Sequence, residues 1–180
     1  MNCYTCAGKT LKPIKLEEGL AARSCDTCGG IHIDLLAYRA WSEDVRLLHD
    51  PEEVHPTPIE VDDNQKALLC QRCEKLMTKY RISSSGPNFI DLCASCDDVW
   101  LDEGEWQLLG QLNLQGKLTN IATEPWQRSV RATAIAQSSK DHLMDILGED
   151  LNQAQDFADW VKSHPQRSLL FKFLKNEIGE

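Results

Sequence analysis

Four Cys-x-x-Cys pairs constrain this chain more than any other feature of its sequence. They are separated by 18, 41 and 19 residues, and together they use all eight cysteines. The two short intervals match the spacing of roughly 15–20 residues expected within a four-cysteine zinc site, and the long interval separates two such sites. We therefore predict two Zn²⁺ per chain, one bound by Cys3, Cys6, Cys25 and Cys28 and one by Cys70, Cys73, Cys93 and Cys96.

The chain between the cysteine pairs has the pattern of a β-hairpin in both units. Ile14 and Leu16 alternate with charged residues before a turn at Glu18-Gly19, and residues 20–24 return. Tyr80 and Ile82 alternate in the same way, residues 83–88 form a loop, and residues 89–92 return. Each unit has about 50 residues, too few for a self-sufficient core, so bound zinc, worth roughly 10–16 kcal/mol, would decide whether it folds.

The segment after each zinc site is repeated 68 positions later, as CDTCGGIHIDLLAY at 25–38 and CASCDDVWLDEGEW at 93–106. Asp34 and Asp102 are equivalent, and we predict that they are the N-caps of helices over 35–48 and 103–114. The flanking residues fit hydrophobic staples and a capping box: Ile33 with Tyr38, Leu101 with Trp106, and Asp102 with Glu105. His32 aligns with Trp100 and is predicted to be a partly buried core residue, and Asp97-Asp98 to be exposed.

We predict an α+β fold with four parts. These are a zinc ribbon with its helix at 1–50, an acidic Pro-rich linker at 51–69, a second ribbon with its helix at 70–116, and an α-helical module at 120–180. His49 and His55 beside the linker are expected to be surface residues.

The C-terminal module is predicted to contain four helices. One begins at Pro125, a short one capped by Ser139 ends at Gly148, one carries an apolar stripe from Leu151, and one starts at Pro165 after a cap at Ser163 or His164. We expect the stripes to bury one another and the Trp-rich helices of the ribbons. LLFKFL at 169–174 is the expected surplus hydrophobic surface, and it would mark a protein-binding face or a self-association site if its helix does not dock.

These residues resemble the bacterial zinc-finger domain named for transcription factor IIB, in two tandem copies. The second unit carries Val99-Trp100-Leu101-Asp102-Glu103-Gly104-Glu105, close to the whole family signature, and the first carries Gly29, Gly30 and Asp34. Both units lack the proline that usually follows the first cysteine of each pair, and Asp97-Asp98 replaces the double glycine. The resemblance ends by residue 115 and implies a zinc ribbon with a connection to transcription.

The charge of the chain bears on its partners. The formal net charge is −9, and each zinc tetrathiolate adds a net −2, so two sites would bring it to −13. This disfavours a nucleic-acid partner, whose binding depends on Lys and Arg, and favours a protein. Two groups of basic residues either form a solvated surface or bind a partner. They are Lys9, Lys12 and Lys15, and Arg72, Lys75, Lys79 and Arg81.

We therefore predict a non-catalytic zinc-binding adaptor or regulator that binds a macromolecular partner, with no small-molecule substrate and no membrane span. A nucleic-acid-binding regulator and a redox or iron protein with Cys-x-x-Cys groups are the alternatives. The eight cysteines, together with an N-terminus MNCYTCAGKT that lacks an apolar signal core, predict a cytoplasmic protein. No motif of an enzyme active site occurs in the sequence.

Overall fold

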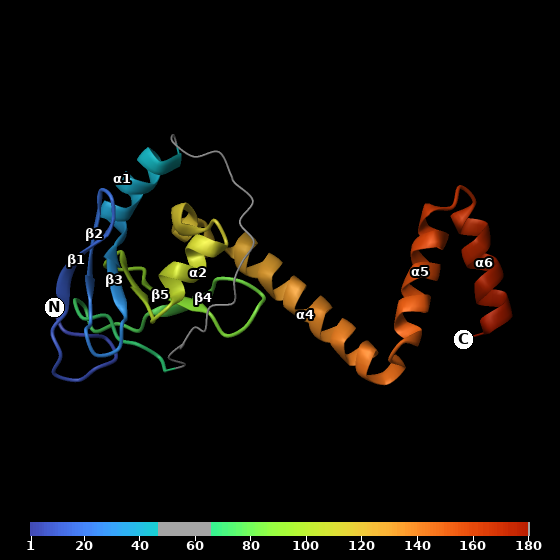
Figure 1. The fold of residues 1–180 in the computed structure, drawn as a ribbon, viewed down its shortest axis with the longest axis horizontal. Coiled ribbons are helices and arrows are strands. Elements are labelled where there is room, and N and C mark those ends of the chain that lie inside the picture. The colour runs from blue at the N-terminus through green and yellow to red at the C-terminus, as the bar shows by residue number, and fades with distance from the viewer. Residues whose placement is uncertain (47–65, 180) are drawn as a thin grey trace. The chain divides into compact units, whose positions relative to one another are not determined.

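The computed structural model of the chain describes residues 1–46 and 66–179. The chain divides into two compact units, 1–133 and 134–180, and the fold is α+β, as predicted (Figure 1). The predicted end of the first helix near residue 48, most of the linker at 51–69, and His49 and His55 lie outside the described residues. Among the described helices, none has the length and apolar character needed to cross a membrane.

The described part of the first unit contains one antiparallel sheet of six strands, in the order β1-β2-β3-β6-β5-β4. The predicted hairpins are confirmed as β1 (Lys12–Glu17) with β2 (Leu20–Ser24), and β4 (Thr78–Arg81) with β5 (Phe89–Cys93). The repeated segment supplies two further strands, β3 (Ile31–Asp34) and β6 (Asp98–Leu101), which the hairpin pattern does not predict. These two strands pair with each other, so both ribbons belong to one sheet.

The pairing of β3 with β6 relates the two ribbons by an approximate two-fold axis. His32 lies opposite Trp100, and on either side Ile31 pairs with Leu101 and Ile33 with Val99. Residues 31, 32 and 33 are the sequence equivalents of 99, 100 and 101, so each strand pairs with its own repeat in a self-complementary manner. The palindromic strand order follows from the same symmetry.

The two faces of the sheet pack against different clusters, because successive side chains along a strand point to opposite faces. Ile33 and Leu101, together with Val99, face a hydrophobic core that also contains Tyr38 and Leu109 of the helices. Trp100 faces the opposite side, where it packs with the cysteines in a second buried cluster. The core that stabilises the sheet is therefore separated from the cysteines by the sheet itself.

The first helix begins as predicted and the second does not. In α1 (Leu35–Arg46), Asp34 Oδ1 accepts hydrogen bonds from the backbone N–H groups of Leu36 at 2.9 Å and Ala37 at 3.2 Å, which confirms the cap. Helix α2 (Glu105–Gln111) instead begins after Gly104, whose φ of 86° ends the preceding turn. Asp102 is therefore not its N-cap, and the Asp102 carboxylate accepts the Trp100 indole N–H at 2.8 Å.

The chain continues through η1 (Gln115–Lys117) and α3 (Leu118–Ile121) into a single long helix, α4 (Glu124–Leu147). The prediction that Ser139 caps a separate helix is wrong, since helix continues through it; serine inside an exposed helix is only mildly unfavourable. Gly148, with φ of 54°, follows the end of α4 as predicted, and its N–H donates to the Met144 carbonyl at 2.8 Å.

The start of α4 covers the edge of the sheet within the first unit. The Gln127 side-chain amide accepts the Arg81 backbone N–H at 3.1 Å and donates to the Arg81 carbonyl at 2.9 Å, as a neighbouring strand would. The Trp126 indole N–H donates to the Ile82 carbonyl at 3.2 Å. These contacts occupy backbone groups of edge strand β4 and of the residue after it, which would otherwise be open to another chain.

The second unit contains the rest of α4 and the helices α5 (Asp150–Ser163) and α6 (Arg167–Ile178). The predicted turn between α5 and α6 is confirmed, although α6 starts two residues after Pro165. His164 acts in that turn, where its Nδ1 accepts the Gln166 N–H at 3.1 Å. The apolar stripes bury one another only in part, because Leu169, Phe171 and Phe173 are more than half exposed.

Candidate metal centres

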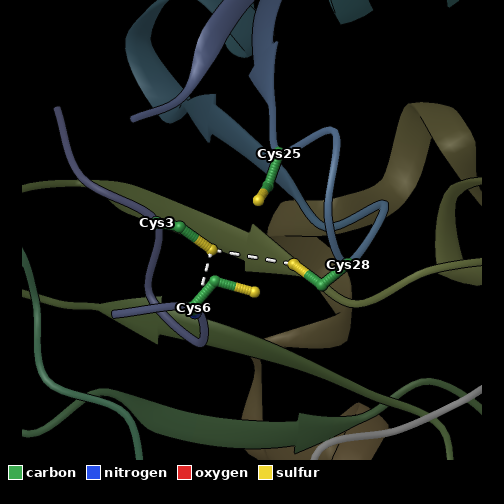
Figure 2. A group of neighbouring side chains, drawn as sticks. All are labelled: Cys3, Cys6, Cys25 and Cys28. Carbon is green, nitrogen blue, oxygen red and sulfur yellow. Dashed lines mark hydrogen bonds between the residues drawn. The ribbon is translucent and has the colours of Figure 1, made fainter. Parts of the chain in front are cut away.

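The eight cysteines form two groups of four, made of the sets predicted from their spacing. In each group the four sulfurs lie within 4.8 Å of one another, close enough to hold a metal ion. Figure 2 shows the first group, where the sulfurs of Cys3 and Cys6 from the N-terminal turn point toward those of Cys25 and Cys28 after β2. Among residues 1–46 and 66–179, no third group of metal-binding side chains comes this close together.

The spacing of the sulfurs fits a tetrahedral ion. A Zn–S bond of about 2.3 Å places two sulfurs of a tetrahedral site about 3.8 Å apart. The Cys3 and Cys28 sulfurs are 3.6 Å apart, and so are those of Cys73 and Cys93. This is far longer than the roughly 2.05 Å of a disulfide bond, and all eight cysteines are free thiols.

The turns that carry the first cysteine of a pair also orient backbone N–H groups toward the sulfur. The Cys3 sulfur accepts N–H groups from Thr5 at 3.4 Å and Cys6 at 3.2 Å, and the Cys70 sulfur accepts that of Arg72 at 3.4 Å. These bonds confirm that the two-residue spacing produces a tight turn around the sulfur. Because they stabilise negative charge on sulfur, they favour the thiolate that binds metal.

Two thiols of the second group have pKa values that are shifted in opposite directions. The hydrogen bond from the Lys75 backbone N–H lowers the pKa of Cys73 to about 7, whereas the hydrogen bond with Cys73 raises the pKa of Cys96 to about 12. Four thiolates this close repel one another, so a bound cation is needed to ionise all four near neutral pH. The donor set is therefore suited to a divalent ion.

Each group is largely buried. The first cysteine of every pair is buried and the second is half-buried: Cys3, Cys25, Cys70 and Cys93 against Cys6, Cys28, Cys73 and Cys96. Four sulfur ligands complete a tetrahedral shell and leave no position for water or substrate. In zinc proteins, a complete set of four sulfur ligands is typical of structural sites.

The two centres are joined through the residues at the approximate two-fold axis. Tyr4, between the first two cysteines, stacks on Trp100 of the other ribbon with ring centroids 4.9 Å apart, and on His32 at 5.9 Å. Arg72, at the position equivalent to Thr5, forms ion pairs with Asp34 at 3.0 Å and with Asp98 through its Nε at 3.1 Å. Both turns therefore contact the strand pair β3–β6.

At this axis, equivalent positions of the two ribbons hold different residues: Gly30 corresponds to Asp98, and His32 corresponds to Trp100. The Trp100 indole lies against Gly30, because a Cβ at Gly30 would be only 2.1 Å from the Trp100 Cζ2. On the other side, His32 Nε2 donates to the Asp98 carboxylate at 2.9 Å. The imidazole of His32 is small enough to leave room for Asp98, whereas the larger indole of Trp100 requires glycine at the equivalent position 30. His32 is a buried structural residue, as predicted, but Asp98 is fully buried, and the prediction that it is exposed is wrong.

Glu105 is a buried residue that the sequence identifies only in part. Its carboxylate accepts the Asp102 N–H at 2.7 Å, which is the predicted capping-box contact, and also the Phe89 N–H at 2.8 Å. The second bond ties the start of α2 to strand β5, which carries Cys93. The sequence gives no signal for this bond, because residues 89 and 105 meet only when β5 and β6 pair.

Comparisons with protein-family models, with curated proteins and with solved structures found no match to this chain. The resemblance to the transcription-factor-IIB-type ribbon therefore stays a prediction.

Proposed function

We propose that this protein is a non-catalytic zinc-binding adaptor that holds two Zn²⁺ and binds a macromolecular partner, a protein rather than a nucleic acid. The observation that carries the proposal is the presence of two separate sets of four sulfurs, each within 4.8 Å. Thiolate ligands in a tetrahedral arrangement favour Zn²⁺ over hard cations such as Mg²⁺ and Ca²⁺. With four sulfurs on each ion, the metal stabilises the sheet and does not perform chemistry.

The ion pairs of the basic side chains support a protein partner. In the first group of basic residues, Lys9, Lys12 and Lys15, Lys12 forms an ion pair with Asp26. In the second, Arg72 pairs with two carboxylates, and Lys79 pairs with Asp91 at 2.9 Å. Cations already paired with carboxylates attract phosphate weakly, and the chain carries a net charge of −9. A connection with transcription, implied by the family resemblance, would then pass through a protein contact.

Metal titration tests the proposal at the level of coordination. We expect the reduced apo-protein to bind two Co²⁺ with the absorption of tetrahedral tetrathiolate complexes, and Zn²⁺ to displace both. Binding of one ion, or spectra with nitrogen or oxygen ligands, would contradict the assignment of the eight cysteines. A red-brown protein as purified would indicate iron instead of zinc.

A salt titration separates the two classes of partner. We expect the zinc-loaded chain to show no binding to duplex DNA that falls steeply with salt concentration. A nucleic-acid reader that contacts several phosphates loses affinity with a steep logarithmic slope. Tight DNA binding with such a slope would replace the adaptor by the nucleic-acid-binding alternative.

A further inference from the structure

The second unit, residues 134–180, buries too little apolar surface to be stable alone. Among its described residues, Leu151 is the one buried hydrophobic side chain. The unit is shorter than the roughly 70–80 residues below which a single core gives only marginal stability. Its exposed large hydrophobic residues are Ile135, Leu143, Met144, Ile146, Leu147, Phe157, Trp160, Leu169, Phe171, Phe173 and Ile178.

Both helices of the α5–α6 hairpin expose apolar side chains. On α5, Phe157 and Trp160 are about half exposed and stack with ring centroids 5.7 Å apart, and Trp160 also contacts the His164 ring at 5.6 Å. On α6, Phe171 is 67% and Phe173 59% exposed. Exposed apolar side chains on both helices are typical of a site of association between proteins.

The charges of the two helices identify the partner. Helix α5 carries three acidic residues and one Lys, whereas α6 carries three basic residues and one Glu: Asp150, Asp156, Asp159 and Lys162 against Arg167, Lys172, Lys175 and Glu177. A hairpin with one acidic and one basic helix becomes complementary to itself when a two-fold rotation places α5 of one copy beside α6 of the other. The same rotation buries the exposed apolar side chains on the sides of α5 and α6 that face the other copy.

We propose that the helical unit binds a second copy of this chain, with two α5–α6 hairpins packing as a symmetric four-helix bundle. Each acidic helix lies beside the basic helix of the other copy, and the exposed side chains of α5 and α6 form the centre of the interface. The inference goes beyond the adaptor function, because it assigns the helical unit to self-association and leaves both ribbons of each copy to the partner.

Sedimentation of the full zinc-loaded chain over a range of concentrations tests the proposal. We expect a reversible dimer, and we expect Phe173→Glu to weaken it at least tenfold, since a charge would enter the apolar centre of the interface. Leu36→Glu is the matched control, because Leu36 is also a hydrophobic helix residue, 73% exposed on α1 of the first unit. A chain that stays monomeric at every concentration, or a dimer that only Leu36→Glu weakens, would overturn the proposal.

Charge reversal distinguishes pairing between copies from pairing within one chain. We expect Asp156→Lys and Lys172→Glu each to weaken the homodimer, by about tenfold across its two equivalent contacts. Mixing the two variants should restore the dimer, since both contacts of the mixed dimer again join opposite charges. Failure of the mixture to associate better than either variant alone would overturn the proposal.

The zinc content of the same samples keeps this test separate from the adaptor proposal. The metal sites lie in the first unit, so we expect two Zn²⁺ per chain in every variant, whether dimeric or not. A monomeric chain with two Zn²⁺ would overturn the dimer alone. A dimer without bound metal would overturn the zinc assignment alone.

Discussion

Replacing Gly30 by Ala tests the contact that joins the two ribbons. The added Cβ would lie 2.1 Å from Trp100 Cζ2 and 2.6 Å from Cη2, whereas ordinary contact begins at 3.4 Å. The indole would therefore have to move by about 1.3 Å. It has little freedom to do so, because Trp100 is fully buried, stacks on Tyr4 and donates its N–H to Asp102 at 2.8 Å.

The size of the effect follows from these contacts. Overpacking of a well-packed core costs about 1–3 kcal/mol, and loss of a hydrogen bond to a charged group adds about 1.5–3 kcal/mol if the indole is displaced from Asp102. Replacement of glycine by alanine returns up to about 1 kcal/mol through the unfolded chain. We therefore expect the free energy of unfolding to fall by about 2–4 kcal/mol.

The assay is urea unfolding of the zinc-loaded protein, followed by the near-UV circular dichroism of its buried tryptophans. Gly116→Ala is the matched control, because its Cβ would meet no atom within 4 Å, and we expect a change below about 1 kcal/mol. Trp100→Phe shortens the ring, so Gly30→Ala should cost much less in that background. A loss below about 0.5 kcal/mol, with an unchanged tryptophan signal, would refute the described packing at the two-fold axis.

Three further predictions concern the ligands, the buried histidine and the covered sheet edge. Cys93→Ser should reduce bound zinc below two per chain and raise hydrogen exchange in both ribbons, because β3 and β6 pair; loss confined to the second ribbon would contradict this. Burial lowers the pKa of His32 despite its hydrogen bond to a carboxylate, so the free energy of unfolding should fall as the pH falls below about 6.5. In His32→Gln, the free energy of unfolding should depend less on pH in this range. Equal pH dependence in both proteins would argue against a neutral His32. Gln127→Leu leaves the N–H and carbonyl of Arg81 without their amide partner, so the free energy of unfolding in urea should fall by about 1–3 kcal/mol. Gln137→Leu, at an exposed position, should change it little. Equal effects of the two substitutions would contradict the edge contact.

The local features of the ribbons could be predicted from the sequence because they depend on neighbouring residues. The spacing of the cysteines identifies the two groups, and alternation around Ile14 and Tyr80 identifies the hairpins. The cap at Asp34 follows from its position before an apolar helix, and its carboxylate accepts two N–H groups there. At Asp102 the same reasoning fails, because the carboxylate accepts the indole N–H of Trp100, two residues earlier, and α2 begins only after Gly104.

The joining of the ribbons could not be predicted from local patterns. Strands β3 and β6 have four residues each and lead directly into a helix or a turn, so they are too short for alternation to identify them clearly as strands. Their partner is the repeat itself, 68 positions away. The buried state of Asp98 has the same origin, since His32 reaches it only across the paired strands. The duplication of the segment is the sequence feature from which the symmetric pairing of β3 with β6, and with it the burial of Asp98, could have been inferred.

The central claim is that each group of four cysteines holds one Zn²⁺, and native mass spectrometry of the purified, reduced chain tests it most directly. We predict a mass that corresponds to the polypeptide with two Zn²⁺, which a strong chelator removes together with the β-sheet signal in circular dichroism. A folded chain at the mass of the bare polypeptide would contradict the claim.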